Sequence, residues 1–170
     1  PRGLEILIQA HPVALGLDHA KVTIIPINQK LWRNHPYFTN KLPDGRVFAT
    51  LGAGPLNGNL VSAPNRERDV GLTLEGENTF SRHCPNRDTT KTEDQLIREL
   101  IAADAAYRDN LDYEYFPTGG TDGHNSNSYV SGLLRATGFI FPRPADTPGF
   151  DKPVPREAFR SRQSSPGRRR

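Results

Sequence analysis

Residues 121–134 read TDGHNSNSYVSGLL, and this stretch decides how the second half of the chain folds. Small hydrogen-bonding side chains lead directly into apolar residues, from Tyr129 to Leu134, that recur with the spacing of a helix. Glycines between residues 119 and 123 allow the backbone to turn sharply just before it. The pattern predicts a helix from about Ser126 to Thr137, ended by Gly138.

A hydroxyl group at this junction has two interpretations. The Ser126 side chain would lie near the positive end of the helix, where a developing oxyanion is stabilised, so it is a candidate nucleophile. Ser and Asn also open helices because their oxygens accept hydrogen bonds from free backbone N–H groups. This stretch alone favours the cap, and both interpretations stay open.

The rest of the chain predicts an α+β fold. The expected elements, in chain order, are strands at 4–10, 19–27, 46–51 and 59–62 with a glycine-rich turn at 52–58, a polar surface loop at 65–86 that allows one short strand at 70–74, a helix at 92–107, an extended segment at 112–116 and the helix at 126–137. The first two strands should form an antiparallel pair. Thr92 and Gln95 fit a capping box at the start of the earlier helix. Together these elements predict a mostly antiparallel sheet with two packed helices.

Composition limits the domain organisation and the partners. The 170 residues are enough for one domain, expected at residues 1–142, followed by a Pro/Arg-rich extended or disordered tail at residues 143–170. The tail has six arginines from Arg156 onward, but we interpret it as a solvated terminus and expect no nucleic-acid partner. We also expect no membrane span, and the single cysteine, Cys84, cannot form an internal disulfide or a paired-cysteine metal site.

A hydroxyl nucleophile needs a base, and His19 is the best placed histidine. It follows Asp18 at the beginning of a β-branched strand, which would hold it rigidly and half exposed. It could equally be a polar residue at a strand edge without a role. His124 lies two residues before Ser126 and either lines the same pocket or is a turn residue.

A histidine that opens a strand, followed much later by Asn-Ser-Asn-Ser-Tyr-Val at a helix start, resembles a known layout. Residues 19–24 and 125–130 are similar to the two motifs of circularly permuted papain-like hydrolases, the NlpC/P60 and lecithin:retinol acyltransferase-like group. The order of elements is similar from about residue 3 to residue 140. One departure is that Ser126 stands where the family has Cys. It is either a true serine variant, an inactivating substitution or part of an accidental likeness.

The resemblance implies a hydrolase or acyltransferase that acts on an amide or ester, with a peptide or a lipid acyl group as substrate. Ser126 would be the nucleophile and His19 the base, with Asn125, Asn127 and His124 binding the oxyanion or the substrate. A third catalytic member should come from the next strand, and its candidates are Thr50, Asn57 and Asn59. It implies no cofactor and no metal.

The first residue is Pro1, and no signal-peptide pattern follows it, so we expect a piece of a longer polypeptide whose localisation stays open. Domains of this family occur as C-terminal toxic modules of bacterial secreted effectors, and such a module would need an immunity protein. Two rival hypotheses remain. One is a noncatalytic binding module, or an inactivated hydrolase, on the same fold. The other is a metal-dependent nuclease built around Asp18, His19 and Asn125.

Overall fold

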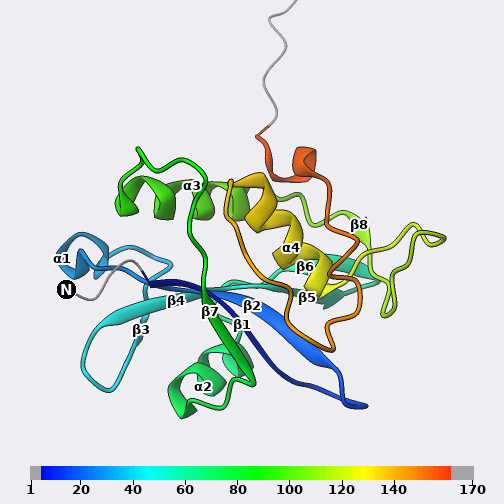
Figure 1. Cartoon of the computed structure of the whole chain (residues 1–170), viewed down its shortest axis with the longest axis horizontal. Coiled ribbons are helices and arrows are strands. Elements are labelled where there is room, and N and C mark those ends of the chain that lie inside the picture. The colour runs from blue at the N-terminus through cyan, green and yellow to red at the C-terminus, as the bar shows by residue number, and fades with distance from the viewer. Residues whose placement is uncertain (1–4, 162–170) are drawn as a thin grey trace, which may run out of the picture.

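The computed structural model describes residues 5–161. Its strands are β1 (Glu5–Pro12), β2 (Asp18–Ile25), β3 (Asn40–Lys41), β4 (Val47–Leu51), β5 (Ala53–Leu56), β6 (Asn59–Ser62), β7 (Phe80–His83) and β8 (Leu111–Asp112). Its helices are α1 (Gln29–Trp32), α2 (Glu67–Glu75), α3 (Glu93–Ala106), α4 (Ser126–Ala136) and the 3-10 turn η1 (Arg156–Phe159). The expected α+β class with antiparallel strands is therefore confirmed (Figure 1).

The main sheet has the strand order β3-β4-β2-β1-β7, and all its pairs are antiparallel. The β1–β2 pair matches the expected hairpin, and its register sets His11 directly opposite His19. Because residues directly opposite each other in an antiparallel pair point to the same side, these two histidines lie on the same face of the sheet. A smaller sheet, β5-β6-β8, continues beyond β4.

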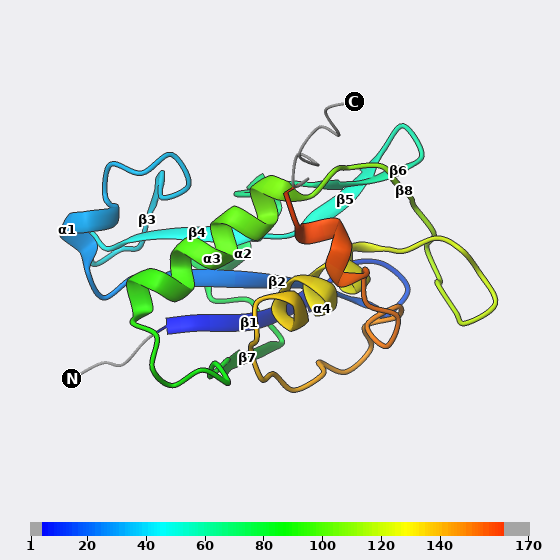
Figure 2. The same ribbon diagram turned by 90° about the horizontal axis from the view of Figure 1, so that it is seen from above.

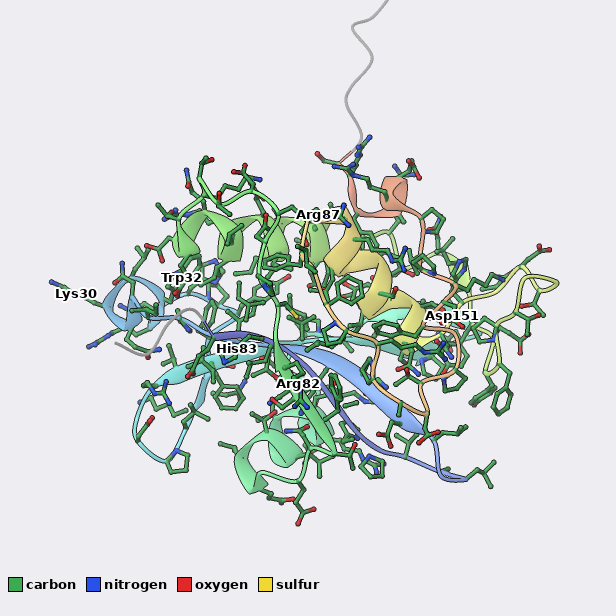
Figure 3. All side chains as sticks on the ribbon, in the orientation of Figure 1. Lys30, Trp32, Arg82, His83, Arg87 and Asp151 are labelled. Carbon is green, nitrogen blue, oxygen red and sulfur yellow. The ribbon has the colours of Figure 1, made fainter. Side chains whose placement is uncertain are left out.

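The helices cover both faces of the main sheet. α3 and α4 lie over one face, whereas α2 lies against the other (Figures 1 and 2). The capping box at Thr92 and Gln95 forms as expected and begins α3. The indole of Trp32 in α1, labelled in Figure 3, donates a 2.7 Å hydrogen bond to Asp94 at the start of α3. Among residues 5–161, none of the helices combines the length and the apolar character that crossing a membrane requires.

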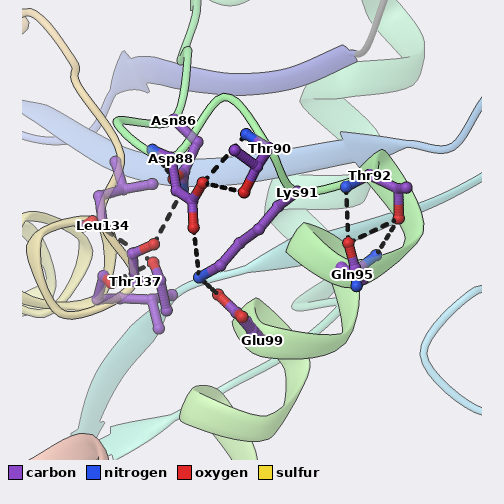
Figure 4. A network of polar contacts seen from close by, with 10 residues as sticks. Asn86, Asp88, Thr90, Lys91, Thr92, Gln95, Glu99, Leu134 and Thr137 are labelled. Carbon is purple, nitrogen blue, oxygen red and sulfur yellow. Dashed lines mark hydrogen bonds and ion pairs between the residues drawn. The ribbon is translucent and has the colours of Figure 1, made fainter.

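A polar loop ties α3 to the end of α4 (Figure 4). Lys91 donates to Glu99 of α3 at 2.9 Å and also lies 3.9 Å from Asp88. The Asn86 amide donates to the Thr137 carbonyl oxygen, the C-cap of α4, at 2.9 Å. These contacts fix the end of α4 that lies away from Ser126.

Two expectations need correction. Residues 65–86 are not a surface loop with a strand at 70–74, because they form α2 and β7. Residues 52–58 are not wholly a turn, since most of them form β5 and the reversal is confined to Asn57 and Gly58. Leu4, the expected start of the first strand, lies outside the described residues.

The expected tail is also different where the structure describes it. Phe150, Val154 and Phe159 are buried in the same core as α3 and α4, so residues 143–161 are not an extended appendage. Burial of three such side chains contributes several kcal/mol, on the order of 2 kcal/mol each, which offsets the low helical and strand propensity of a proline-rich segment. The remaining tail arginines, at 162–170, lie outside the described residues.

Candidate active site

The start of α4 is capped by Asn125, not by Ser126. The Asn125 Oδ1 atom accepts hydrogen bonds from the backbone N–H groups of Asn127 and Ser128, both at 3.0 Å. Ser126 is therefore the first residue of the helix, and its hydroxyl does not serve as the cap. This geometry answers the question that the sequence left open about the role of the serine in the helix.

A second asparagine fastens the helix start to β2. Asn127 Oδ1 accepts from the backbone N–H of Ala20 at 2.8 Å, while its Nδ2 donates to the Asp18 carbonyl oxygen at 3.1 Å. His19 lies between these two residues, so the amide of Asn127 sets the position of Ser126 relative to His19. β2 offers these groups because its pairing with β4 does not extend back to Ala20.

A strap formed by residues 147–154 holds the same helix start from the other side. The Pro148 carbonyl oxygen accepts from both asparagine amides, from Asn125 at 2.8 Å and from Asn127 at 3.0 Å. Ser128 Oγ donates to the Gly149 carbonyl oxygen at 2.9 Å. The helix that carries the candidate nucleophile is thus clamped between β2 and this strap.

Ser126 and His19 line one cavity of about 380 Å³. Its walls are mostly apolar and come from the β1–β2 turn, Pro55 and the segment 113–116, with Arg66 and Asp18 as charged members. The Tyr113 hydroxyl shares a side-chain hydrogen bond with Ser126; burial raises the pKa of this tyrosine, and the hydrogen bond opposes that effect.

Asp69 of α2 lies behind His19. Its Oδ1 atom is 3.5 Å from His19 Nε2 and 2.9 Å from His11 Nε2. The three side chains are only 1% (His11), 6% (His19) and 1% (Asp69) exposed. Burial works to raise the pKa of Asp69, but the two histidines beside its carboxylate hold that pKa below its usual range, so the carboxylate is ionised.

A buried lysine fixes α2 in this position. Lys21 Nζ donates to the Asp69 carbonyl oxygen at 2.5 Å and to Thr73 Oγ1 at 2.7 Å. Burial lowers the pKa of Lys21 to about 8, against an opposing attraction by Asp69. Gly52 leaves room for the carboxylate, since a Cβ atom there would lie 3.2 Å from Asp69 Oδ2.

Asn125 and Asn127, expected to bind the oxyanion or the substrate, line the same cavity as Ser126. Both amide hydrogens of Asn125 and of Asn127 are donated to carbonyl oxygens of the protein, so these side chains position the helix and are not free to bind an oxyanion. His124 is buried but is not one of the residues that line the cavity. Burial, aided by the charge of Lys152, lowers the pKa of His124.

Neither the three candidates for the third catalytic member nor Asp69 lines the cavity. Thr50 is buried opposite Thr23, Asn57 forms the β5–β6 turn, and Asn59 pairs with Asp112. The carboxylate beside His19 comes instead from Asp69, on a helix that the sequence analysis did not expect. Acidic residues in the first turn of α2 and the left-handed Gly76 at its end were the available signals for that helix.

Comparisons with protein-family models, with curated proteins and with solved structures gave no match for this chain. The geometry itself defines two chemical possibilities. Ser126, His19 and Asp69 have the residue types of a nucleophile, a base and an orienting carboxylate. His11, His19 and Asp69 have the residue types of a two-histidine, one-carboxylate metal site.

Proposed function

We propose that this domain is a serine hydrolase or acyltransferase that cleaves an amide or ester, in the manner of the permuted papain-like enzymes it resembles. The observation that carries the proposal is the placement of Ser126. It begins α4 without acting as its cap and lines the same cavity as His19, which is backed by the ionised Asp69.

In the proposed reaction, Ser126 Oγ attacks the acyl carbon and His19 takes the hydroxyl proton. The bond from the acyl carbon to the leaving nitrogen or oxygen then breaks, and His19 returns the proton to that atom. Water, or an acceptor hydroxyl in a transferase, attacks the acyl-serine with His19 again as base, and Ser126 is regenerated. The Ser126 backbone N–H and the Tyr113 hydroxyl are the donors we assign to the oxyanion.

Asp69, the third member of the proposed site, suits a serine nucleophile. With His19 Nε2 facing Asp69, Nδ1 is the ring nitrogen left for Ser126. A carboxylate in this position stabilises the imidazolium that forms when the ring takes a proton. A serine hydroxyl needs that help more than a cysteine thiol, because the thiol ionises far more readily.

The cavity favours an apolar acyl group as substrate. Its apolar rim includes Val13, Leu15, Tyr115 and Phe116, which are 44%, 89%, 68% and 53% exposed. Leu15 has a left-handed backbone, φ 58°, at the tip of the β1–β2 turn, which presents its side chain outward. Such a concentration of exposed apolar side chains around a cavity mouth is typical of a binding surface.

The biological setting proposed with this activity follows from the resemblance alone. It is a domain of a longer bacterial protein that is secreted or delivered to a target cell, with an immunity protein as its inhibitor. Co-purification of the inactive Ser126→Ala domain with the product of a neighbouring reading frame tests that setting.

The test of the chemistry is turnover of p-nitrophenyl esters of two, six and ten carbons, combined with labelling by a fluorophosphonate. We expect kcat/KM to rise with chain length, and Ser126→Ala to lower kcat by about 1,000-fold or more and abolish labelling. Ser131→Ala is the matched control, since this serine lies on the same helix with a buried hydroxyl that has no hydrogen-bond partner. Equal turnover in both variants would remove Ser126 from the mechanism.

A noncatalytic binding module is the second candidate, and the hydrogen bond between Ser126 and Tyr113 favours it, because a hydroxyl held by a tyrosine is not held by the base. Tyr113→Phe separates the two. A catalytic Ser126 loses oxyanion stabilisation in that variant, so kcat falls while KM changes little. In a binding module, no turnover is seen with either residue at position 113.

A further inference from the structure

The β1–β2 register and α2 bring three metal-binding side chains to one buried point. His11 and His19 pair across the hairpin, and Asp69 reaches them from the opposing helix. One ligand atom from each residue lies within 4.8 Å of the others. Two imidazoles and a carboxylate are a donor set that suits zinc and other first-row transition metals better than Mg²⁺ or Ca²⁺.

Two buried polar atoms of this cluster have no hydrogen-bond partner, His19 Nε2 and Asp69 Oδ2. Buried side-chain atoms without a partner are uncommon, and each calls for a ligand or another explanation. Both atoms face the space above Gly52, where a Cβ atom would lie 3.9 Å from His19 Nε2. The absence of a side chain at residue 52 keeps that space open.

The hydrogen bond of His11 supplies a third argument. His11 Nδ1 lies 3.2 Å from the Pro12 carbonyl oxygen, which can only accept. In the tautomer that donates Nδ1–H to this oxygen, Nε2 presents a lone pair toward Asp69 Oδ1, 2.9 Å away, as a metal ligand does. In the metal-free protein, a proton on Nε2 instead makes this contact a hydrogen bond to the carboxylate. A backbone carbonyl behind Nδ1 is the usual support of a metal-binding histidine.

The charged groups next to the cluster do not occupy it. Lys21 directs its ammonium group to the Asp69 carbonyl oxygen and to Thr73, not to the carboxylate oxygens. Arg68 donates to the Pro12 carbonyl oxygen at 2.9 Å. The positive charge of Lys21 weakens metal binding, so we expect micromolar rather than picomolar affinity.

We infer that His11, His19 and Asp69 bind one zinc ion and that zinc reversibly inhibits the proposed hydrolase. The ion binds His19 Nε2, which places the ring proton on Nδ1 and leaves no lone pair there for the Ser126 proton. The inhibition rests on the proposed function, whereas the binding does not. The site therefore couples the activity to free zinc through a residue common to both.

The binding test is titration of the folded domain with Co²⁺, followed by its visible absorption, and displacement of Co²⁺ by Zn²⁺. We expect one equivalent with nitrogen and oxygen ligands, and at least about 100-fold weaker binding in His11→Gln and Asp69→Asn. Ser126→Ala should bind as tightly as the wild-type domain, although it loses turnover. Gly52→Ala, which keeps all three ligands but fills the space above them, should also weaken binding. A wild-type domain without a Co²⁺ band at millimolar metal overturns the site, as does unchanged binding in both ligand variants.

The regulatory half is measured on the wild-type domain with the best ester substrate. Zinc should lower kcat at the concentration that fills the site, and a chelator should restore it. Full turnover with the site occupied refutes the inhibition but leaves the binding intact. If no ester or amide is turned over while Co²⁺ binds, the proposed hydrolase fails independently, and the cluster is a metal site without a serine mechanism.

Discussion

Replacement of Gly149 by alanine tests whether the strap positions the candidate nucleophile. Gly149 has a φ of +82°, a left-handed conformation that residues with a side chain adopt at a cost of about 1–2 kcal/mol. An added Cβ atom would also lie 2.5 Å from Asn125 Oδ1 and 2.6 Å from Pro117 Cγ. Asn125 Oδ1 is the cap of α4, so the clash falls on the group that orders Ser126.

The two costs can be separated by a second glycine. Gly45 has a φ of +87°, and an added Cβ atom would meet nothing within 4 Å. Gly45→Ala should therefore lower the free energy of unfolding by about 1–2 kcal/mol, from backbone strain alone. Gly149→Ala adds an overpacking cost of about 1–3 kcal/mol, so its total is about 2–5 kcal/mol.

Denaturant unfolding of both variants measures the difference, and ester turnover below the unfolding transition measures the consequence. A displacement of Ser126 by about 1 Å should lower kcat/KM by about 100-fold in Gly149→Ala and leave Gly45→Ala unchanged. Equal destabilisation of the two variants would show that a side chain at residue 149 does not clash with Asn125. Full turnover in a destabilised Gly149→Ala domain would show that Ser126 does not depend on it.

Three further predictions use other parts of the structure. Gly132→Ala should destabilise the domain by about 1–3 kcal/mol in thermal unfolding, because its Cβ atom would lie 2.5 Å from the Val154 carbonyl oxygen. Gly71→Ala is the control, since an added Cβ atom there meets open space and should stabilise α2 by about 0.5–1 kcal/mol. If both variants were stabilised, the packing of residues 143–161 would be contradicted. Burial lowers the pKa of Lys21 to about 8 from 10.5, so between these pH values the unfolded chain binds more protons than the folded domain. The free energy of unfolding should therefore rise between pH 8 and pH 9 through this group, and Lys21→Met should lack that rise. Parallel pH profiles of the two proteins would refute the prediction. Burial raises the pKa of Cys84 to about 12, so iodoacetamide should label it only after unfolding, and rapid labelling of the native domain would disprove its burial.

The sequence predicted the elements whose signals are local. The hairpin of β1 and β2, the capping box of α3 and the polar start of α4 follow from alternation, capping and helical spacing within short windows. α2 was missed because its apolar face is weak: its fully buried member is Asp69, a charged residue that no periodicity marks as a core position. The burial of residues 143–161 was missed because proline excludes regular structure but does not exclude packing.

The candidate site was half predictable for the same reason. Ser126 and His19 could be named because each opens a regular element, and their partners could not because they depend on contacts distant in sequence. Asn125 and Asn127 were expected to bind the oxyanion or the substrate, and the sequence does not show that their amide hydrogens are donated to the carbonyl oxygens of Asp18, Tyr115 and Pro148. The register of the hairpin was the one signal that would have set His11 beside His19.

His19 cannot act as the catalytic base and as a metal ligand at the same time, and this conflict makes the metal site inhibitory. The catalytic role needs a proton on Nε2, donated toward Asp69, so that Nδ1 is free to accept from Ser126. The metal role needs a lone pair on Nε2 and therefore places the proton on Nδ1. His11 belongs to the second role alone, since it lies behind Asp69 and does not line the cavity. A purely catalytic site would have no need of a second buried histidine on the same carboxylate oxygen. The effect of His11→Gln on metal binding, rather than on turnover, therefore distinguishes the metal role of the cluster from its catalytic role.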